Sequence, residues 1–250
     1  MSEGGSNPES SASPDRNSIS PSPLVGSTSI SRKRMTYLIA YPPTRTFLFY
    51  GKSPLLLLQL QLLSSPTPNH ASPALNLELP SHFACRHRKT IALVVDSNSE
   101  QKLAAFRVKN GKEHISVEDM MFSVISNLSD KNRKNYEFTS VRNHFQFICR
   151  WTRYKRRKSS DEAGSFEWRF VMLSTPVPFS LEAKPLARIT KNAIIFSSDF
   201  QDVLASISSQ DAEITKTKFV RTVLILGLWV LIGEGYVDPV GKRNRTCVCF

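Results

Sequence analysis

The run TVLILGLWVLIG, from Thr222 to Gly233, decides the fold, because it places twelve uncharged residues between Arg221 and Glu234. In a helix its apolar side chains would point to every side, and a helix that is apolar all round is buried on all faces. Twelve residues span about 18 Å as a helix, whereas a bilayer core needs roughly 20 apolar residues. We therefore expect a buried helix and no transmembrane helix. The side chains expected to form its core are Leu224, Leu228, Trp229 and Ile232.

A fully buried strand is the alternative interpretation of the same run. The length of the run favours a helix, because strands are usually shorter than twelve residues. Gly227 counts against a helix, since a glycine in a helix interior costs about 1 kcal/mol.

Short apolar segments separated by polar or proline-containing breaks precede this run. The segments expected to be strands are Thr36–Ala40, Thr46–Tyr50, Thr90–Val95, Lys102–Val108, Tyr136–Ser140, His144–Trp151, Phe166–Leu173, Leu186–Thr190 and Ala193–Phe196. Leu55–Leu63 fits either a buried strand or a short helix. Several short strands that follow one another with such breaks between them indicate an all-β barrel or sandwich. A helix that is apolar all round fits such a chain if it lies inside a closed barrel.

Two of these segments show the strand pattern most clearly. Aromatic residues alternate with polar ones in His144–Thr152 and again in Phe166–Met172. A period of two places one face of a strand in a core and the other toward solvent. We expect the two segments to pair, with the charged residues 154–165 as a solvated loop between them.

Composition divides the chain into three parts. Residues 1–31 contain eleven serines and four prolines and no aromatic residue, so we expect a disordered tail over residues 1–34. Residues 35–236 are expected to form the barrel domain, with the proline-containing segment 64–82 as a surface insertion. Residues 237–250 are expected to be a basic tail.

The chain has a formal net charge of +12, and its densest basic cluster lies around the expected hairpin. The six cations of this cluster are Arg150, Arg153, Lys155, Arg156, Arg157 and Lys158. A solvated hairpin tip is the common role of such a charge run. The functional alternatives are an anionic membrane surface, which attracts each cation by about 1 kcal/mol, and nucleic acid. We expect anionic lipid as the partner and no specific nucleic acid.

Two short motifs are candidate modification sites. Cys247-Val248-Cys249-Phe250 fits the prenylation pattern with a terminal Phe, and basic residues precede it, so Cys247 is a candidate for lipidation. Ser159 follows Arg156-Arg157-Lys158 and is a candidate for phosphorylation. A tail with two unmodified cysteines and a chance kinase motif are the alternatives.

Motifs of the common enzyme classes are absent from the sequence. It contains no Gly-x-Ser-x-Gly, Walker or Gly-x-Gly-x-x-Gly motif, and its five histidines lack the spacing of metal ligands. We therefore expect no enzyme, no metal and no cofactor; a small β-barrel enzyme with its site at a barrel mouth is the alternative. The N-terminus lacks an apolar signal region, so we expect a protein that is not secreted. We further expect it to be a monomer in the cytoplasm, peripheral at a membrane.

Five short motifs follow one another in a characteristic order: Leu103-Ala104-Ala105-Phe106, Phe147–Trp151, Phe166–Phe170, Leu186-Ala187 and Leu224–Trp229. This order resembles the tubby C-terminal-like superfamily, which includes the tubby-like proteins, the LURP-one-related plant proteins and the phospholipid scramblases. The chain looks most like an uncharacterised fungal branch of that group. The resemblance implies a closed antiparallel barrel of about a dozen strands around a central hydrophobic C-terminal helix. It does not imply one activity. Tubby proteins bind phosphoinositides through basic residues on the barrel surface, and no pattern of this sequence matches that site residue by residue; we expect a non-catalytic binding or scaffold module.

Overall fold

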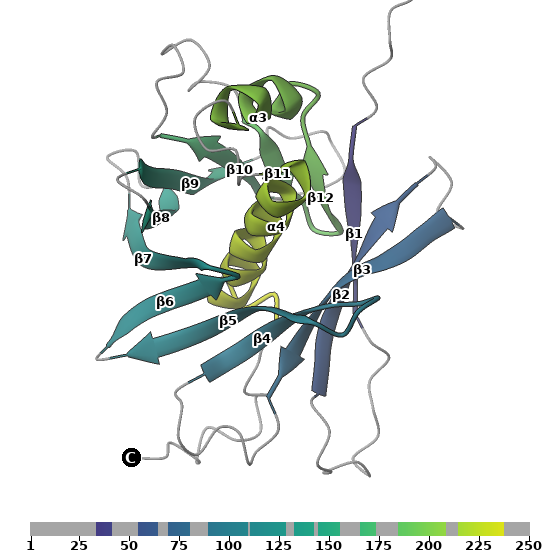
Figure 1. Cartoon of the computed structure of the whole chain (residues 1–250). Coiled ribbons are helices and arrows are strands. Elements are labelled where there is room, and N and C mark those ends of the chain that lie inside the picture. Colours follow the sequence, from purple (N-terminus) through teal and green to yellow (C-terminus); the bar gives the residue numbers. More distant parts are fainter. Residues whose placement is uncertain are drawn as a thin grey trace, which may run out of the picture. The chain divides into compact units, whose positions relative to one another are not determined.

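The computed structural model describes residues 34–41, 55–64, 70–80, 90–109, 111–128, 133–142, 145–155, 166–173, 185–208 and 215–237. Within these ranges twelve strands form one closed antiparallel barrel, which confirms the expected mainly β fold class (Figure 1). Strands that follow one another in the chain are paired, and β1 also pairs with β12 to close the ring. The strands are β1 (Thr36–Ala40), β2 (Leu55–Leu63), β3 (Ala71–Leu79), β4 (Thr90–Asp96), β5 (Lys102–Lys109), β6 (Lys112–Val117), β7 (Met120–Leu128), β8 (Lys134–Arg142), β9 (Phe145–Lys155), β10 (Phe166–Met172), β11 (Ala187–Ile189) and β12 (Ala193–Phe196).

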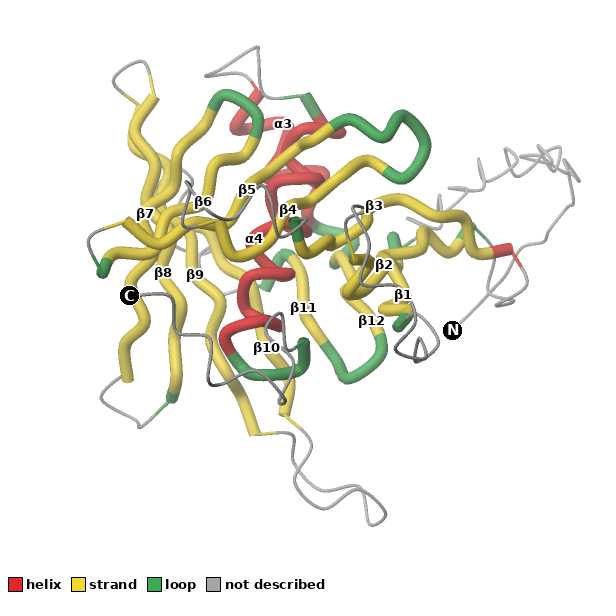
Figure 2. Tube along the Cα trace, turned by 90° about the horizontal axis from the view of Figure 1, so that it is seen from below, coloured by secondary structure: helices red, strands yellow, loops and turns green. Residues whose placement is uncertain are grey.

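The apolar run forms the C-terminal two thirds of helix α4, Lys216–Gly233, and the strands surround this helix (Figure 2). Every residue from Thr222 to Leu231 is buried, which confirms a central helix rather than a strand. The helix ends in a Schellman motif: Tyr236 N–H donates to Leu231 O at 3.0 Å, and Gly235 takes the left-handed φ of 73° that this motif requires. A shorter helix, α3 (Phe200–Ser208), precedes α4.

Gly227 lies at a close approach of α4 to the barrel wall. A Cβ at this position would lie 3.2 Å from Ile194 Cδ1 and 3.4 Å from both Ile189 Cδ1 and Trp151 Cζ2. Contacts of 3.2 Å between carbon atoms are shorter than ordinary van der Waals packing. The glycine that weakens the helix locally therefore lets it pack against β9, β11 and β12.

Aromatic side chains fill the space between the helix and the strands. Trp229 is 3% exposed and packs edge-to-face on Phe106, with 5.2 Å between ring centroids. Trp151 and Phe170 face each other across the β9–β10 pair at 5.2 Å. Leu224 and Leu228 are buried beside them, whereas Ile232 is only partly buried at the edge of the core.

The structure differs from the sequence-based expectation between residues 64 and 82. Ala71–Leu79, expected within a surface insertion, is strand β3 and pairs with both β2 and β4. Leu75 and Leu77 alternate inward with a period of two and are buried, while Pro73 lies beside a register shift of the β2–β3 pair. A proline at a bulge does not break a strand, because its missing N–H is not needed there. Leu55–Leu63 is a strand, and Thr46–Tyr50 lies outside the described residues.

Strands β6 and β7 were not expected from the sequence. They are joined by a tight turn in which Glu118 adopts a φ of 48°, a conformation that glycine or asparagine usually provides. The turn therefore carries no composition signal. The preceding β5–β6 connection does carry one, since the sequence Asn110-Gly111 is typical of hairpins and Gly111 has a φ of 73°.

Candidate anion-binding surface

The two arginines predicted to begin the basic cluster lie on opposite faces of β9. Arg150 lies on the outer face and binds Glu137 of β8, with 2.7 Å between Nη2 and Oε2 and 3.3 Å between Nε and Oε2. Arg153 shares the inward-facing period of Trp151 and lies at the end of the barrel. Lys155 ends the strand and is exposed. Arg156, Arg157, Lys158, Ser159 and Cys247 lie outside the described residues.

Arg153 is part of a charged cluster that holds the C-terminal end of α4. The Glu234 carboxylate, only 7% exposed, lies 2.6 Å from Lys134 Nζ and 3.5 Å from Arg153 Nη1, and it accepts a 3.0 Å hydrogen bond from Tyr136 Oη. The guanidinium of Arg153 also stacks on Phe166 at 3.6 Å from the ring centre. The hydrogen bond to Glu234 raises the pKa of Lys134, and burial raises the pKa of Tyr136. This cluster is structural, and Arg153 is not on the outer surface.

The outer face of β8–β11 is basic beyond the predicted hairpin. The guanidinium groups of Arg133 and Arg169 lie over the ring of Tyr154, at 4.7 and 4.5 Å from its centre. Arg188 pairs with Arg169 in register across β10 and β11. The cations of this face are Arg133, Arg150, Arg169 and Arg188, and its acids are Glu137 and Glu167. We call this set the basic face. Lys155 pairs with Phe166 on the same face of β9 as Trp151 and is exposed because it ends the strand.

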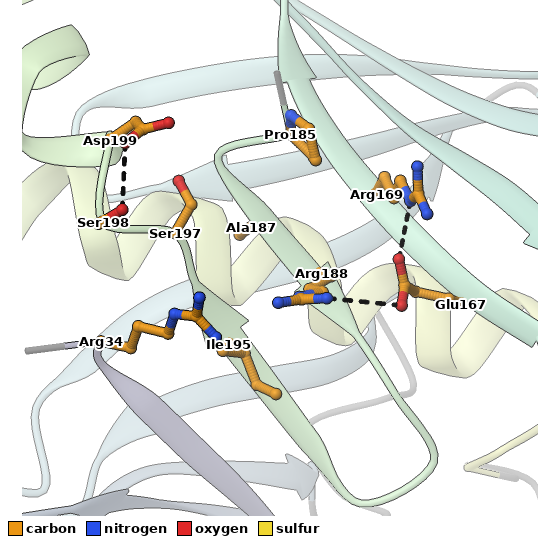
Figure 3. A pocket seen from close by; sticks show the side chains of 10 residues that line it. All are labelled: Arg34, Glu167, Arg169, Pro185, Ala187, Arg188, Ile195, Ser197, Ser198 and Asp199. Carbon is orange, nitrogen blue, oxygen red and sulfur yellow. Dashed lines mark hydrogen bonds and ion pairs between the residues drawn. The ribbon is translucent and has the colours of Figure 1, made fainter. Parts of the chain in front are cut away.

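A pocket of about 340 Å³ opens at one end of the basic face, over β10, β11 and β12 (Figure 3). Arg34, just before β1, lines it together with Arg169 and Arg188. Glu167, 13% exposed, lies between two of these arginines, at 2.7 Å from Arg169 Nε and 3.9 Å from Arg188 Nη1. The segment leading into α3 forms the opposite wall, with Ser197, Ser198 and Asp199.

Sequence reasoning missed the three arginines of the pocket. Arg34 lies more than 130 residues from Arg169 in the chain, and the two meet because β1 pairs with β12 to close the barrel. The alternation of residues 166–172 predicts that Arg169 points outward, but it does not predict which strand lies beside β10.

Comparison of the chain with protein-family models, with curated proteins and with solved structures finds no match. The described residues include no group of three or more His, Cys, Asp or Glu side chains that could hold a metal ion. Within the same ranges no helix is both long and apolar enough to cross a membrane. The basic face and its pocket are guanidinium-rich, and guanidinium groups bind carboxylates and phosphates with paired hydrogen bonds.

Proposed function

We propose that this protein is a non-catalytic binding module that engages an anionic, phosphoinositide-containing membrane surface through the basic face and the hairpin beyond it. The observation that carries this proposal is the charge of the basic face, where four cations stand against two carboxylates. Each Lys or Arg near an anionic membrane contributes about 1 kcal/mol of attraction. The resemblance to the tubby superfamily supports the same function.

The arrangement of the cations suits a surface rather than a single small ligand. Arg150 and Arg169 are each held by a carboxylate at 2.7 Å, so these two pairs position guanidinium groups that keep further N–H donors. Lys155, at the end of β9, leads into Arg156, Arg157 and Lys158 in the sequence. The basic face has a net charge of +2, and Lys155 with these three cations adds four positive charges in the sequence that we propose meet lipid headgroups as well.

Liposome flotation of the full chain tests the proposal. Vesicles of phosphatidylcholine alone are compared with vesicles that also contain phosphatidylserine or a phosphoinositide. The test variant combines Arg133→Gln, Lys155→Gln and Arg157→Gln, and it spares Arg153 because that side chain holds Glu234. The matched control removes three exposed cations elsewhere, with Lys102→Gln, Lys112→Gln and Lys216→Gln.

We expect recovery on the anionic vesicles only, with a loss of about tenfold or more for the test variant if three contacts of about 1 kcal/mol are removed. The control should retain its recovery. Equal recovery of the test variant and the native chain would refute the proposal. Retention on RNA that falls steeply with salt, without recovery on vesicles, would replace it with nucleic-acid binding.

A further inference from the structure

The pocket over β10, β11 and β12 contains hydrogen-bond donors that the folded chain does not use. We propose that it binds a phosphate monoester group. This inference goes beyond the proposed membrane surface, because a soluble phosphomonoester is sufficient to fill the pocket. It rests on the cavity, on three arginines from separate segments and on one unpartnered hydroxyl.

Two guanidinium groups in the pocket keep free donors. Arg188 Nη1 lies 3.9 Å from Glu167 Oε2, which is an ion-pair separation but longer than a hydrogen bond. Arg34 is exposed and takes part in no hydrogen bond or ion pair with any residue that the structure describes. In Figure 3 the side chains of Arg34 and Arg188 both lie near Ile195.

Ser197 supplies a third donor. Its Oγ is shielded from solvent and has no hydrogen-bond partner among the described residues, while the residue lines the pocket, so its side chain must rotate toward the cavity to reach a ligand. A buried hydroxyl without a partner is less stable than a hydrogen-bonded one, so a ligand oxygen that reaches it would supply the missing partner. Its neighbour Ser198 is already engaged, because its Oγ donates to Asp199 Oδ1 at 3.1 Å.

The charge of the pocket favours an anion with more than one charge. Glu167 is matched by Arg169 at 2.7 Å, so it neutralises one arginine and orients a second. Arg34 and most of the charge of Arg188 remain for a ligand. A phosphate monoester carries between −1.5 and −2 at neutral pH and presents three terminal oxygens, which suits two guanidinium groups and a hydroxyl on different walls. A carboxylate has two oxygens in one plane and satisfies a single guanidinium.

The volume of the pocket limits the ligand to a small molecule or headgroup. At about 340 Å³ it lies at the lower end of the range for ligand pockets, roughly 300–1,000 Å³. A phosphate with a short polar substituent, such as a glycerol or a sugar ring, fits that range. The phosphate can therefore come from a soluble metabolite or from a lipid headgroup, and the experiment must separate these sources.

Isothermal titration calorimetry of the full chain with glycerol 3-phosphate is the direct test, with glycerate as the carboxylate control. We expect one site per chain and binding of glycerate at least about tenfold weaker. Arg34→Gln and Arg188→Gln should each weaken glycerol 3-phosphate binding by about tenfold, and Ser197→Ala by about threefold to tenfold. Arg133→Gln removes an arginine of the basic face outside the pocket and should change binding less than twofold. Cooperative thermal unfolding of every variant establishes that it is folded.

Vesicles that contain a phosphatidylinositol monophosphate form the second arm. If Arg34→Gln and Arg188→Gln abolish recovery on these vesicles while Arg133→Gln and Lys155→Gln do not, the phosphate is carried by a lipid and the pocket proposal holds without the wider membrane surface. If the pocket variants lose only glycerol 3-phosphate, the ligand is soluble. Binding of neither probe, or binding that survives Arg34→Gln and Arg188→Gln together, would overturn the inference.

Discussion

The guanidinium of Arg221, in the second turn of α4, lies 2.6 Å from the carboxylate of Asp96, the last residue of β4. One turn earlier, Lys218 lies 2.8 Å from Asp119, in the turn between β6 and β7. Cations near a helix N-terminus and an acid at its C-terminus, here Glu234, oppose the helix dipole. The unfavourable interaction of these charges with the helix dipole is offset by the ion pairs at both ends of α4. Because α4 is apolar on all sides, packing alone specifies its position along the barrel weakly, and we infer that these polar ends fix it.

The Arg221–Asp96 pair should contribute measurably to stability. Arg221→Met leaves the Asp96 carboxylate, only 10% exposed, without its charged partner, and we expect a loss of about 2 kcal/mol in the free energy of unfolding. Urea unfolding of Arg221→Met, Asp96→Asn and the double variant measures the coupling between them. Lys102→Met, at an exposed position, is the control and should change stability by less than about 0.5 kcal/mol. A coupling energy of zero would mean that the pair does not position the helix.

The same carboxyl group predicts how stability changes in acid. Burial raises the pKa of Asp96, but N–H bonds from Ser99 and Asn98 and the charge of Arg221 outweigh it, so the net pKa lies below its ordinary value of 3.8. A folded-state pKa that is lowered gives stability that is present above the unfolded pKa and lost as the pH falls through the folded pKa. The stability difference between the native chain and Asp96→Asn should therefore be constant from pH 7 to about 5 and shrink below about pH 4. A difference that stays constant down to pH 3 would contradict this assignment.

Trp229 is the largest side chain of the central helix, and its removal should unfold the domain. Truncation of a buried tryptophan to alanine costs about 3–5 kcal/mol, and stable domains have about 5–15 kcal/mol in total. We expect Trp229→Ala to be insoluble or to unfold at much lower urea, while Trp229→Phe, which keeps an aromatic contact with Phe106, loses less. A chain that stops at Arg221 should not fold. Cooperative melting of that truncated chain would show that α4 is dispensable to the barrel.

The sequence predicted the parts of the fold in which periodicity and burial agree. The alternation in β9 and β10 is a strong signal, because one face of each strand meets water and the other faces the core. The apolar run of α4 is a strong signal because no side of this helix meets water. Strand β3 was missed because Pro73 and the prolines around the strand were taken as loop residues, although Leu75 and Leu77 alternate. The β6–β7 hairpin was missed because Glu118 occupies a turn position with positive φ that glycine usually marks.

The candidate site was predictable only where it is continuous in the chain. The basic residues from Arg150 to Lys158 are visible as a run, whereas the pocket needs Arg34 beside Arg188, and that contact depends on the closure of the barrel. The inward position of Arg153 was within reach of the sequence, because Arg153 has the same period as Trp151. A count of charges along the chain ignores this period and therefore placed Arg153 on the surface.

Gly227 should be more favourable than alanine at its position, contrary to helix propensity. Alanine improves the helix by about 1 kcal/mol, but its Cβ would lie 3.2 Å from Ile194 Cδ1 in a packed core, and overpacking costs about 1–3 kcal/mol. We expect Gly227→Ala to lose about 1 kcal/mol and Gly227→Val to lose clearly more, as measured by urea unfolding. The double variant Gly227→Ala/Ile194→Val removes the closest methyl and should recover part of the loss. Stabilisation by Gly227→Ala would show that the helix is not held against β12.

Val237, the last residue that the structure describes, lies in the core one position beyond the expected end of the barrel domain. Val237 is 5% exposed and packs in the core, and its N–H donates to Leu231 O at 3.4 Å. A chain that ends after Val237 should melt at the same temperature as the full chain. A chain that ends after Tyr236 loses this buried side chain, worth about 1.5 kcal/mol, and should melt several degrees lower, since 1 kcal/mol corresponds to roughly 2–4 °C at this size. Calorimetry of the two truncated chains, with Val237→Ala in the full chain as control, measures the difference. Equal melting temperatures for both truncated chains would place the boundary of the folded domain before Val237.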